Sequence, residues 1–120
     1  MPMARVLIVE DDAVQARLLK LLVEAWGYEV QTAGNAGEAL TAVHEALPDA
    51  VVTDVEMPGL DGLQLTRVLK ADPATRAVPV IVTSTRPVER EAIAAGSAGF
   101  VSKPISPDRL LALLRVLAPP

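Results

Sequence analysis

The sequence predicts an α/β domain whose parallel sheet is covered by helices on both faces. Five short runs rich in valine, isoleucine and leucine alternate with five segments of helical spacing along the 120 residues, which is the pattern of a sheet buried on both sides. A hydrophobic fraction of 51% is ample for one core, and the length is that of one domain. We therefore expect a single domain over residues 1–120, with no output domain in this chain.

The predicted strands are short and almost wholly apolar. They cover Val6 to Val9, Val30 with its neighbours, Ala50 to Thr53, Val80 to Val82, and Gly99 to Val101. Apolar runs of this length, bounded by turn residues, fit buried strands. We predict that they form a doubly wound, flavodoxin-like (βα)5 sheet in the strand order 2-1-3-4-5.

The first two helices have recognisable start or stop signals. The first runs from about Asp12 to Trp26 and stops at Gly27. The second begins at Asn35, with Glu38 three residues later in an arrangement close to a capping box. In the first helix we expect one stripe to face the core, formed by Val14, Leu18, Leu22 and Ala25.

The other three helices are marked in the same way. The third follows Asp61-Gly62, a turn and helix start. The fourth, Pro87 to Ala95, is short and ends at Gly96. The fifth opens with Ser106 as its cap and Pro107 at its first position.

Polar residues gather at the carboxyl ends of four predicted strands. In a doubly wound sheet, ligands bind at this edge, where the strand order reverses between strands one and three. We therefore expect acids, a hydroxyl and a single lysine to meet there. The four strand ends are Glu10-Asp11-Asp12, Asp54, Thr83-Ser84-Thr85 and Ser102-Lys103-Pro104.

These residue types favour phosphoryl chemistry on a metal ion. Crowded carboxylates repel one another, and a hard divalent cation relieves that repulsion, so Glu10, Asp11 and Asp54 suggest Mg²⁺. Mg²⁺ commonly bridges carboxylates to a phosphate, for which Lys103 and Ser84 would supply a charge and a donor. An aspartate can also act as the nucleophile and form an acyl phosphate.

Two assignments stay open at this level. The acids at the first strand end could merely cap the next helix; we give that role to Asp12 and the metal to the pair before it. Ser84 lies between Thr83 and Thr85, so a shift of one residue would move the hydroxyl role. His44 has no partner motif and is interpreted as a surface histidine.

The stretches VLIVEDD, DVEMPGLDG, VIVTST and GFVSKP resemble the receiver domain of two-component response regulators, over the whole chain. The resemblance implies that Asp54 accepts a phosphoryl group, in a Mg²⁺-dependent reaction, from the phosphohistidine of a sensor histidine kinase or phosphotransfer protein, or from acetyl phosphate. The protein would then be a signalling switch for a downstream protein target. It would catalyse its own phosphorylation and dephosphorylation without being an enzyme by role.

The resemblance also implies roles for single residues. Asp11 and Asp54 would bind Mg²⁺ directly and Glu10 through a water, and the backbone carbonyl of Glu56 would complete the protein ligands. Ser84 and Phe100 match the switch hydroxyl and the switch aromatic. Lys103 matches the catalytic lysine, with a cis peptide bond to the proline after it.

Two features depart from the family's usual pattern, and two further residues stand at its variable positions. Thr85 stands where a small residue is common, and the fourth helix is about one turn shorter than expected. Many members dimerise or meet a target through helix four, strand five and helix five, so a homodimer through that face becomes less expected. Glu56 and Arg86 occupy the variable positions beside the phosphorylation site, and we hypothesise that they pair and screen the acyl phosphate from water.

Composition limits the other possibilities. The net charge of −4 argues against direct nucleic-acid binding, and the absence of cysteine excludes thiol chemistry. The apolar run near the amino terminus is too short to anchor the chain in a membrane, and we expect a cytoplasmic protein.

Two rival classes of protein remain. An aspartate-nucleophile phosphatase would use Asp54 with Glu56 as acid or base, but such enzymes carry this pair on their first strand and need a longer chain to enclose a substrate. An FMN carrier of the same fold would need a phosphate loop where this chain has Glu-Asp-Asp, and aromatic residues to hold the flavin, which make up only 2% of this chain.

Overall fold

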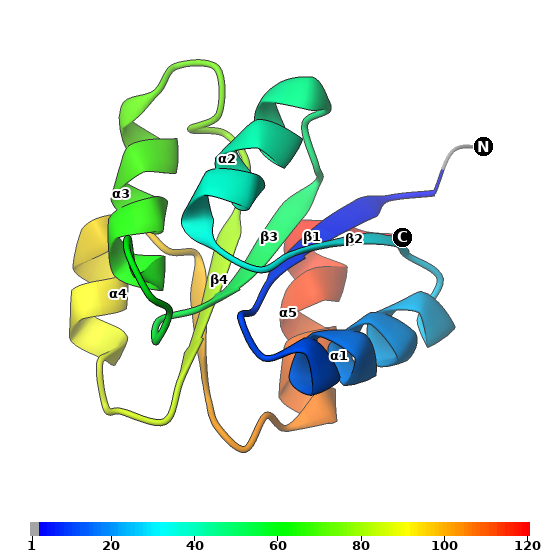
Figure 1. The fold of residues 1–120 in the computed structure, drawn as a ribbon. Coiled ribbons are helices and arrows are strands. Elements are labelled where there is room, and N and C mark those ends of the chain that lie inside the picture. The colour runs from blue at the N-terminus through cyan, green and yellow to red at the C-terminus, as the bar shows by residue number, and fades with distance from the viewer. Residues whose placement is uncertain (1–2) are drawn as a thin grey trace.

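The computed structural model describes residues 3–120 and contains five strands that alternate with five helices (Figure 1). The strands pair in parallel in the order β2-β1-β3-β4-β5, which confirms the predicted doubly wound sheet. Within residues 3–120 no helix combines the length and apolarity needed to cross a membrane. The elements are β1 (Arg5–Val9), α1 (Ala13–Ala25), β2 (Glu29–Ala33), α2 (Ala36–Glu45), β3 (Ala50–Asp54), α3 (Gly62–Ala71), β4 (Val80–Ser84), α4 (Glu89–Ala95), β5 (Gly99–Ser102) and α5 (Pro107–Leu117).

The sheet separates two apolar clusters, because neighbouring strand residues point to opposite faces. On one face Leu7, Val51 and Val82 pack with α2, α3 and α4. On the other, Ile8 and Val101 pack with α1 and α5. Figure 1 shows the same division, with α1 and α5 together on one side of the sheet. Both faces are covered, which explains why β3 and β4 are buried at every position.

Most helices begin at the caps expected from the sequence. The Asp12 side chain accepts hydrogen bonds from the amides of Val14 and Gln15 at 2.9 and 3.0 Å, so it caps α1 as assigned. Asp61 caps α3 in a capping box with Gln64. Helix α4 lacks a side-chain cap and begins at Glu89, two residues later than predicted, which makes this short helix shorter still.

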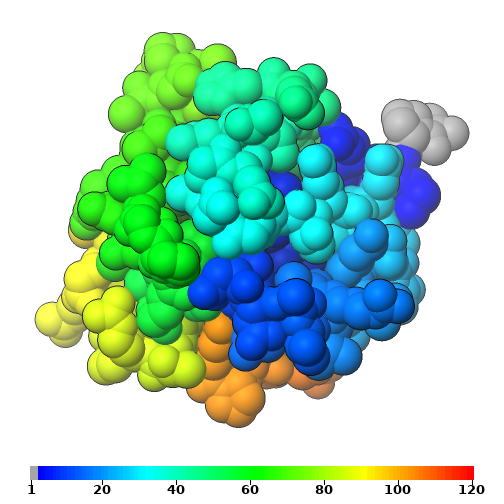
Figure 2. Space-filling model, in the orientation of Figure 1, coloured from blue at the N-terminus to red at the C-terminus, as the bar shows by residue number. Residues whose placement is uncertain are grey.

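The predicted core stripe of α1 is wrong. Val14 and Leu18 are 70% and 62% exposed, whereas Ala16 and Val23 are the buried residues of this helix. Leucines stand on more than one side of α1, so helical spacing alone did not choose the buried face, and the small Ala16 lets the helix approach the sheet. The exposed helix is blue in Figure 2, bordered by the cyan β2–α2 segment.

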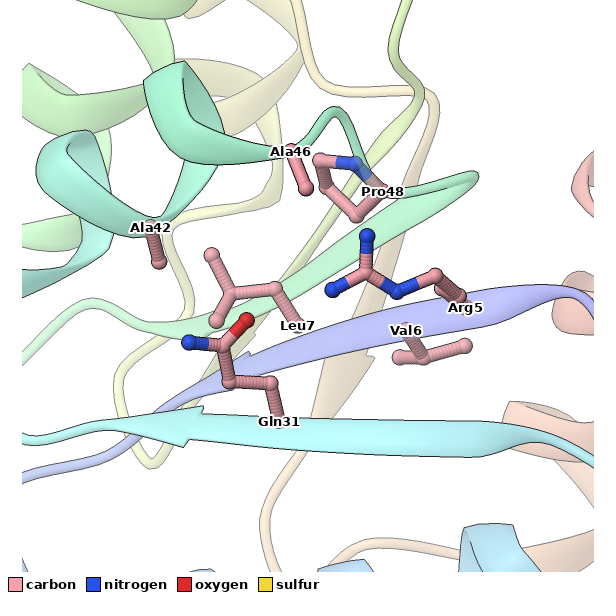
Figure 3. A pocket seen from close by; sticks show the side chains of 7 residues that line it. All are labelled: Arg5, Val6, Leu7, Gln31, Ala42, Ala46 and Pro48. Carbon is pink, nitrogen blue, oxygen red and sulfur yellow. The ribbon is translucent and has the colours of Figure 1, made fainter.

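The amino ends of the strands hold a small cavity. It is lined by residues of β1, β2, α2 and the α2–β3 loop, including Leu7, Gln31, Ala42 and Pro48 (Figure 3). Its volume is about 10 Å³, room for one water molecule. A cavity this small does not bind a substrate, and the chemistry of the chain lies at the opposite edge of the sheet.

Candidate functional site

Three carboxylates meet at the carboxyl edge of the central strands. Glu10 and Asp11 follow β1 and Asp54 ends β3, and the parallel register pairs Val9 with Thr53 just before them. One carboxylate oxygen from each acid lies within 4.8 Å of the others. Glu10 and Asp54 are buried, at 4% and 5% exposure, while Asp11 is exposed. The strand ends therefore bring together the three side chains that the sequence predicted as metal ligands.

Lys103 reaches the same site from the end of β5. Its ammonium lies 3.1 Å from Glu10 Oε1 and 3.1 Å from Asp54 Oδ2, and it donates a third hydrogen bond to Gln15 Oε1 at 3.3 Å. The lysine is followed by a cis bond to Pro104, as the resemblance implied. An ammonium has three hydrogens, so each has an acceptor here.

Burial is the largest single influence on the titration of these groups. It raises the pKa of Asp54, and the hydrogen bond and charge of Lys103 oppose the rise without cancelling it. Burial likewise raises the pKa of Glu10. It would lower the pKa of Lys103, but the bonds to Asp54 and Glu10 outweigh burial and raise that pKa. A single lysine thus does not balance the negative charge of the acidic cluster. This imbalance favours the binding of an additional cation.

One oxygen of Asp54 has no partner. Oδ1 is buried and accepts no hydrogen bond from residues 3–120, whereas Oδ2 is held by Lys103. An unsatisfied buried carboxylate oxygen is costly unless something is to bind it. Together with the other two acids it forms an all-oxygen donor set, which is what a hard divalent cation requires. The residues present therefore fit a metal site.

Ser84 ends β4 and is fully buried, at 0% exposure. Its hydroxyl donates to the Glu56 carboxylate, with both carboxylate oxygens 2.9 Å away. The same oxygen accepts the amide hydrogen of Arg86 at 2.9 Å. The hydroxyl thus lies at the predicted strand end. Its hydrogen-bond acceptor is Glu56, for which the sequence predicted Arg86 as the partner.

Glu56 is held by further donors. The amide and the hydroxyl of Thr85 lie 3.3 and 3.4 Å from Oε1, and Arg86 Nε lies 3.5 Å from Oε2. The hypothesised contact between Glu56 and Arg86 is therefore present. Both side chains are well exposed, at 37% and 57%, so this ion pair is weak.

Phe100 lies in β5 opposite Val82. It is 7% exposed and belongs to the apolar cluster beneath α4, beside Val88 and Ala92. The guanidinium of Arg109 donates to its carbonyl oxygen at 2.9 and 3.2 Å. The ring therefore occupies an inward position on the face of the sheet towards which Ser84 points.

Gly62 has a role that the sequence did not reveal. At the start of α3 its backbone approaches β3 so closely that a Cβ would lie 2.1 Å from the carbonyl oxygen of Asp54. Its amide also donates to the carbonyl of Val55 at 3.0 Å. Glycine is thus what allows the segment after Asp54 to fold back beside the site.

Sequence reasoning also missed Gln15 as a partner of Lys103. The available signal was its position three residues after the cap Asp12, in the first turn of the helix that starts at the acidic edge. A side chain there faces the same edge as the strand ends. The hydrogen bond from Ser84 to Glu56 has no comparable signal in the sequence, because it depends on the path of the β3–α3 loop.

An α/β sheet with clustered carboxylates at its switch point, and a lysine reaching them from β5, defines a class of signalling domain. A profile of that class, the response regulator receiver domain, matches residues 6–115. The chain belongs to this family, in which acceptance of a phosphoryl group is the typical function. It is accordingly a signalling module rather than an enzyme of the usual kind, and the family implies a histidine kinase as partner.

Several curated proteins are similar to the chain. Protein PilH of Pseudomonas aeruginosa is 36% identical over 112 residues, which cover 91% of this chain and 93% of PilH. Response regulator PleD of Caulobacter vibrioides is 38% identical over 117 residues, or 95% of this chain and 26% of PleD. The DNA-binding response regulator MtrA of Mycobacterium tuberculosis is 32% identical, over 92% of this chain and 49% of MtrA. The match thus spans nearly all of PilH, about half of MtrA and a quarter of PleD.

Solved structures agree with this assignment. The chemotaxis protein CheY4 of Vibrio cholerae superposes with a TM-score of 0.89 at 29% identity, covering 97% of this chain and 99% of that one. A sensor protein from Polaromonas gives a TM-score of 0.90 at 32% identity, with 97% and 96% covered. Family membership supports neither the phosphatase nor the flavin carrier considered above.

Proposed function

We propose that the chain is a Mg²⁺-dependent phosphoacceptor switch in which Asp54 receives the phosphoryl group. The observation that carries the proposal is the buried Oδ1 of Asp54, which has no hydrogen-bond partner within residues 3–120 and stands beside a fixed ammonium. A nucleophile needs a free oxygen, and the phosphoryl group that it accepts needs positive charge nearby. Both requirements are met at this one residue.

In the proposed reaction a carboxylate oxygen of Asp54 forms a P–O bond as the donor's bond to phosphorus breaks. With phosphohistidine the P–N bond breaks, and the imidazole leaves with the electron pair and takes a proton from solvent. With acetyl phosphate the anhydride P–O bond breaks and acetate leaves. Attack of water on the phosphorus later releases inorganic phosphate and restores the carboxylate.

Asp11 and Asp54 would hold the Mg²⁺ through their carboxylates, Glu10 through a water, and Glu56 through its backbone carbonyl. When bound, the metal supplies positive charge to the oxygens of the transferred group. Lys103 is already 3.1 Å from Asp54 Oδ2 and would follow the negative charge onto the phosphoryl oxygens. Gln15, at 3.3 Å from the same ammonium, helps to keep it at the mouth of the site.

The Ser84 hydroxyl would donate a hydrogen bond to the phosphoryl group. A shift of Phe100 would then alter the surface formed by α4, β5 and α5. The inward ring of Phe100 supports a role in which its position is coupled to Ser84. Residues 1–120 would act as one receiver unit, phosphorylated by a histidine kinase or a phosphotransfer protein. The output would be a changed affinity for a downstream protein.

Incubation with acetyl phosphate and Mg²⁺, followed by intact-mass measurement, tests the proposal. The wild-type chain should gain one phosphoryl group, and Asp54→Asn or removal of Mg²⁺ with EDTA should abolish the gain. Asp61→Asn is the matched control, because Asp61 is a carboxylate of the same loop that only caps α3, and it should still be labelled. Absence of any adduct that depends on both Mg²⁺ and Asp54 would leave an interaction module without phosphorylation.

A further inference from the structure

We infer that the side chain of Glu56 is a positioning residue for Ser84: it holds the hydroxyl hydrogen that a phosphoryl group on Asp54 must take. The inference rests on the proposed function and assigns to this chain's own carboxylate a place in it. Before phosphorylation Glu56 would keep the switch hydroxyl engaged. The strength of the hydrogen bond from Ser84 to Glu56 would set how readily the phosphorylated state is reached.

The geometry leaves Ser84 no second hydrogen to give. A serine hydroxyl donates one hydrogen bond, and both Glu56 oxygens lie 2.9 Å from Ser84 Oγ. The oxygen's acceptor side is also used, by the Arg86 amide at 2.9 Å. Since Ser84 is fully buried, water does not compete for the hydrogen. A phosphoryl oxygen can receive it only if Glu56 gives it up.

Glu56 can give up the hydroxyl without being left unsatisfied. Its carboxylate keeps the amide and hydroxyl of Thr85 and the guanidinium of Arg86, at 3.3, 3.4 and 3.5 Å. Its side chain is also 37% exposed, so solvent replaces the lost bond. The exchange therefore costs only the net value of one hydrogen bond, and the contact with Ser84 can be made and broken.

The register of the sheet makes the two acceptors competitors. Asp54 pairs with Thr83 across β3 and β4, so Ser84 follows directly at the strand end beside Asp54. A phosphoryl group there would carry negative charge and approach the same hydroxyl from the Asp54 side. Two anionic acceptors for one hydrogen repel each other as well as compete. Removal of the Glu56 carboxylate should therefore favour the phosphorylated form.

A double-mutant cycle separates positioning from charge repulsion. Beryllium fluoride with Mg²⁺ serves as the phosphoryl analogue, and its affinity is measured by calorimetry for the wild type, Glu56→Ala, Ser84→Ala and the double variant. Glu56→Ala should bind the analogue about fivefold to tenfold more tightly, the net value of one intramolecular hydrogen bond. In the Ser84→Ala background the gain should fall to about twofold, because only the repulsion is removed.

Two further variants act as controls. Glu89→Gln neutralises an exposed carboxylate on α4 and should change the affinity less than twofold, as expected for screened charge. Glu56→Gln keeps the shape of the side chain and a weaker acceptor. It should fall between wild type and Glu56→Ala, and it replaces the alanine variant in the cycle if that variant does not fold.

The outcomes distinguish the two claims. Equal gains from Glu56→Ala with and without the Ser84 hydroxyl would overturn the positioning role and leave only repulsion. No gain at all would overturn both effects of Glu56 while leaving the phosphoacceptor function intact. Failure of the wild type to bind beryllium fluoride in a Mg²⁺-dependent way would overturn the proposed function, and the inference with it.

Discussion

The two ends of the sheet differ in the charge of their buried polar groups. At the carboxyl edge, Asp54 is buried with one unpartnered oxygen and its pKa is raised. At the amino end, the buried hydroxyl of Tyr28 donates to the carbonyl of Ala118 at 2.7 Å, and Asp49 accepts the amide of Arg5 at 2.7 Å. Within residues 3–120, the buried atom without a partner is a carboxylate oxygen at the carboxyl edge, whereas at the amino end of the strands it is only a neutral hydroxyl, Ser97 Oγ before β5. The difference indicates that the carboxyl edge is arranged for ligands and the amino end for stability.

The largest expected effect on stability comes from adding a side chain at Gly62, where the start of α3 packs closely against the end of β3. In Gly62→Ala the new Cβ would meet the carbonyl oxygen of Asp54 at 2.1 Å and the Cα of Val55 at 3.0 Å. Both are backbone atoms and cannot move aside cheaply, so we expect a loss of about 3 kcal/mol in the free energy of unfolding. Urea denaturation measures it, and phosphorylation of Asp54 should fall in parallel.

Gly59→Ala is the control for this prediction. Gly59 also lies in the β3–α3 loop and has φ +76, but no atom stands within 4 Å of its Cβ position. The variant should lose only about 1 kcal/mol, the cost of a left-handed conformation for alanine. If both variants were equally stable, the close approach of Gly62 to Asp54 would not constrain the fold.

Removal of one polar group from each end should change stability in opposite directions. Asp54→Asn removes a buried, undercompensated charge and should raise the free energy of unfolding of the metal-free protein by about 1 kcal/mol. Tyr28→Phe leaves the carbonyl of Ala118 without its donor and should lower it by about 1 kcal/mol. Both are read from urea denaturation in EDTA. A loss of stability in Asp54→Asn would mean that Lys103 fully compensates the charge of Asp54.

The same contrast explains what the sequence could predict. The strand order and the meeting of Glu10, Asp11, Asp54 and Lys103 follow from alternation and from the rule for carboxyl ends of strands. They depend on backbone topology, which hydrophobic patterns encode. Caps such as Asp12 were predictable for a related reason, since a cap is a local interaction within one turn of chain.

What the sequence did not predict depends on side chains from separate segments. The buried face of α1 was misassigned because apolar residues such as Leu18 stand on more than one side of the helix. The partner of Ser84 depends on the path of the β3–α3 loop, which places Glu56 near the end of β4. That path in turn depends on Gly62, whose closeness to Asp54 is a matter of three-dimensional packing.

The smallest expected effect lies at the surface, where the last turn of α2 meets the end of α3. His44 Nδ1 lies 2.7 Å from the carbonyl of Leu40, and Nε2 lies 3.4 Å from Asp72 Oδ2. A neutral ring has one N–H and can serve only one of these acceptors, so the imidazolium form is favoured. The bond to the Leu40 carbonyl, and then the one to Asp72, accordingly raise the pKa of His44 above its ordinary 6.5.

Since the folded state binds this proton more tightly, the stabilisation is complete below pH 6.5, the ordinary value, and is lost as the pH rises through the raised pKa of His44. His44→Gln should flatten that part of the stability profile and leave phosphorylation of Asp54 unchanged. Both groups are exposed, so the change should be small and should shrink further in high salt. Urea midpoints measured across this pH range, at low and high salt, provide the test. An unaltered profile in His44→Gln would show that the pair with Asp72 adds nothing to the variation of stability with pH.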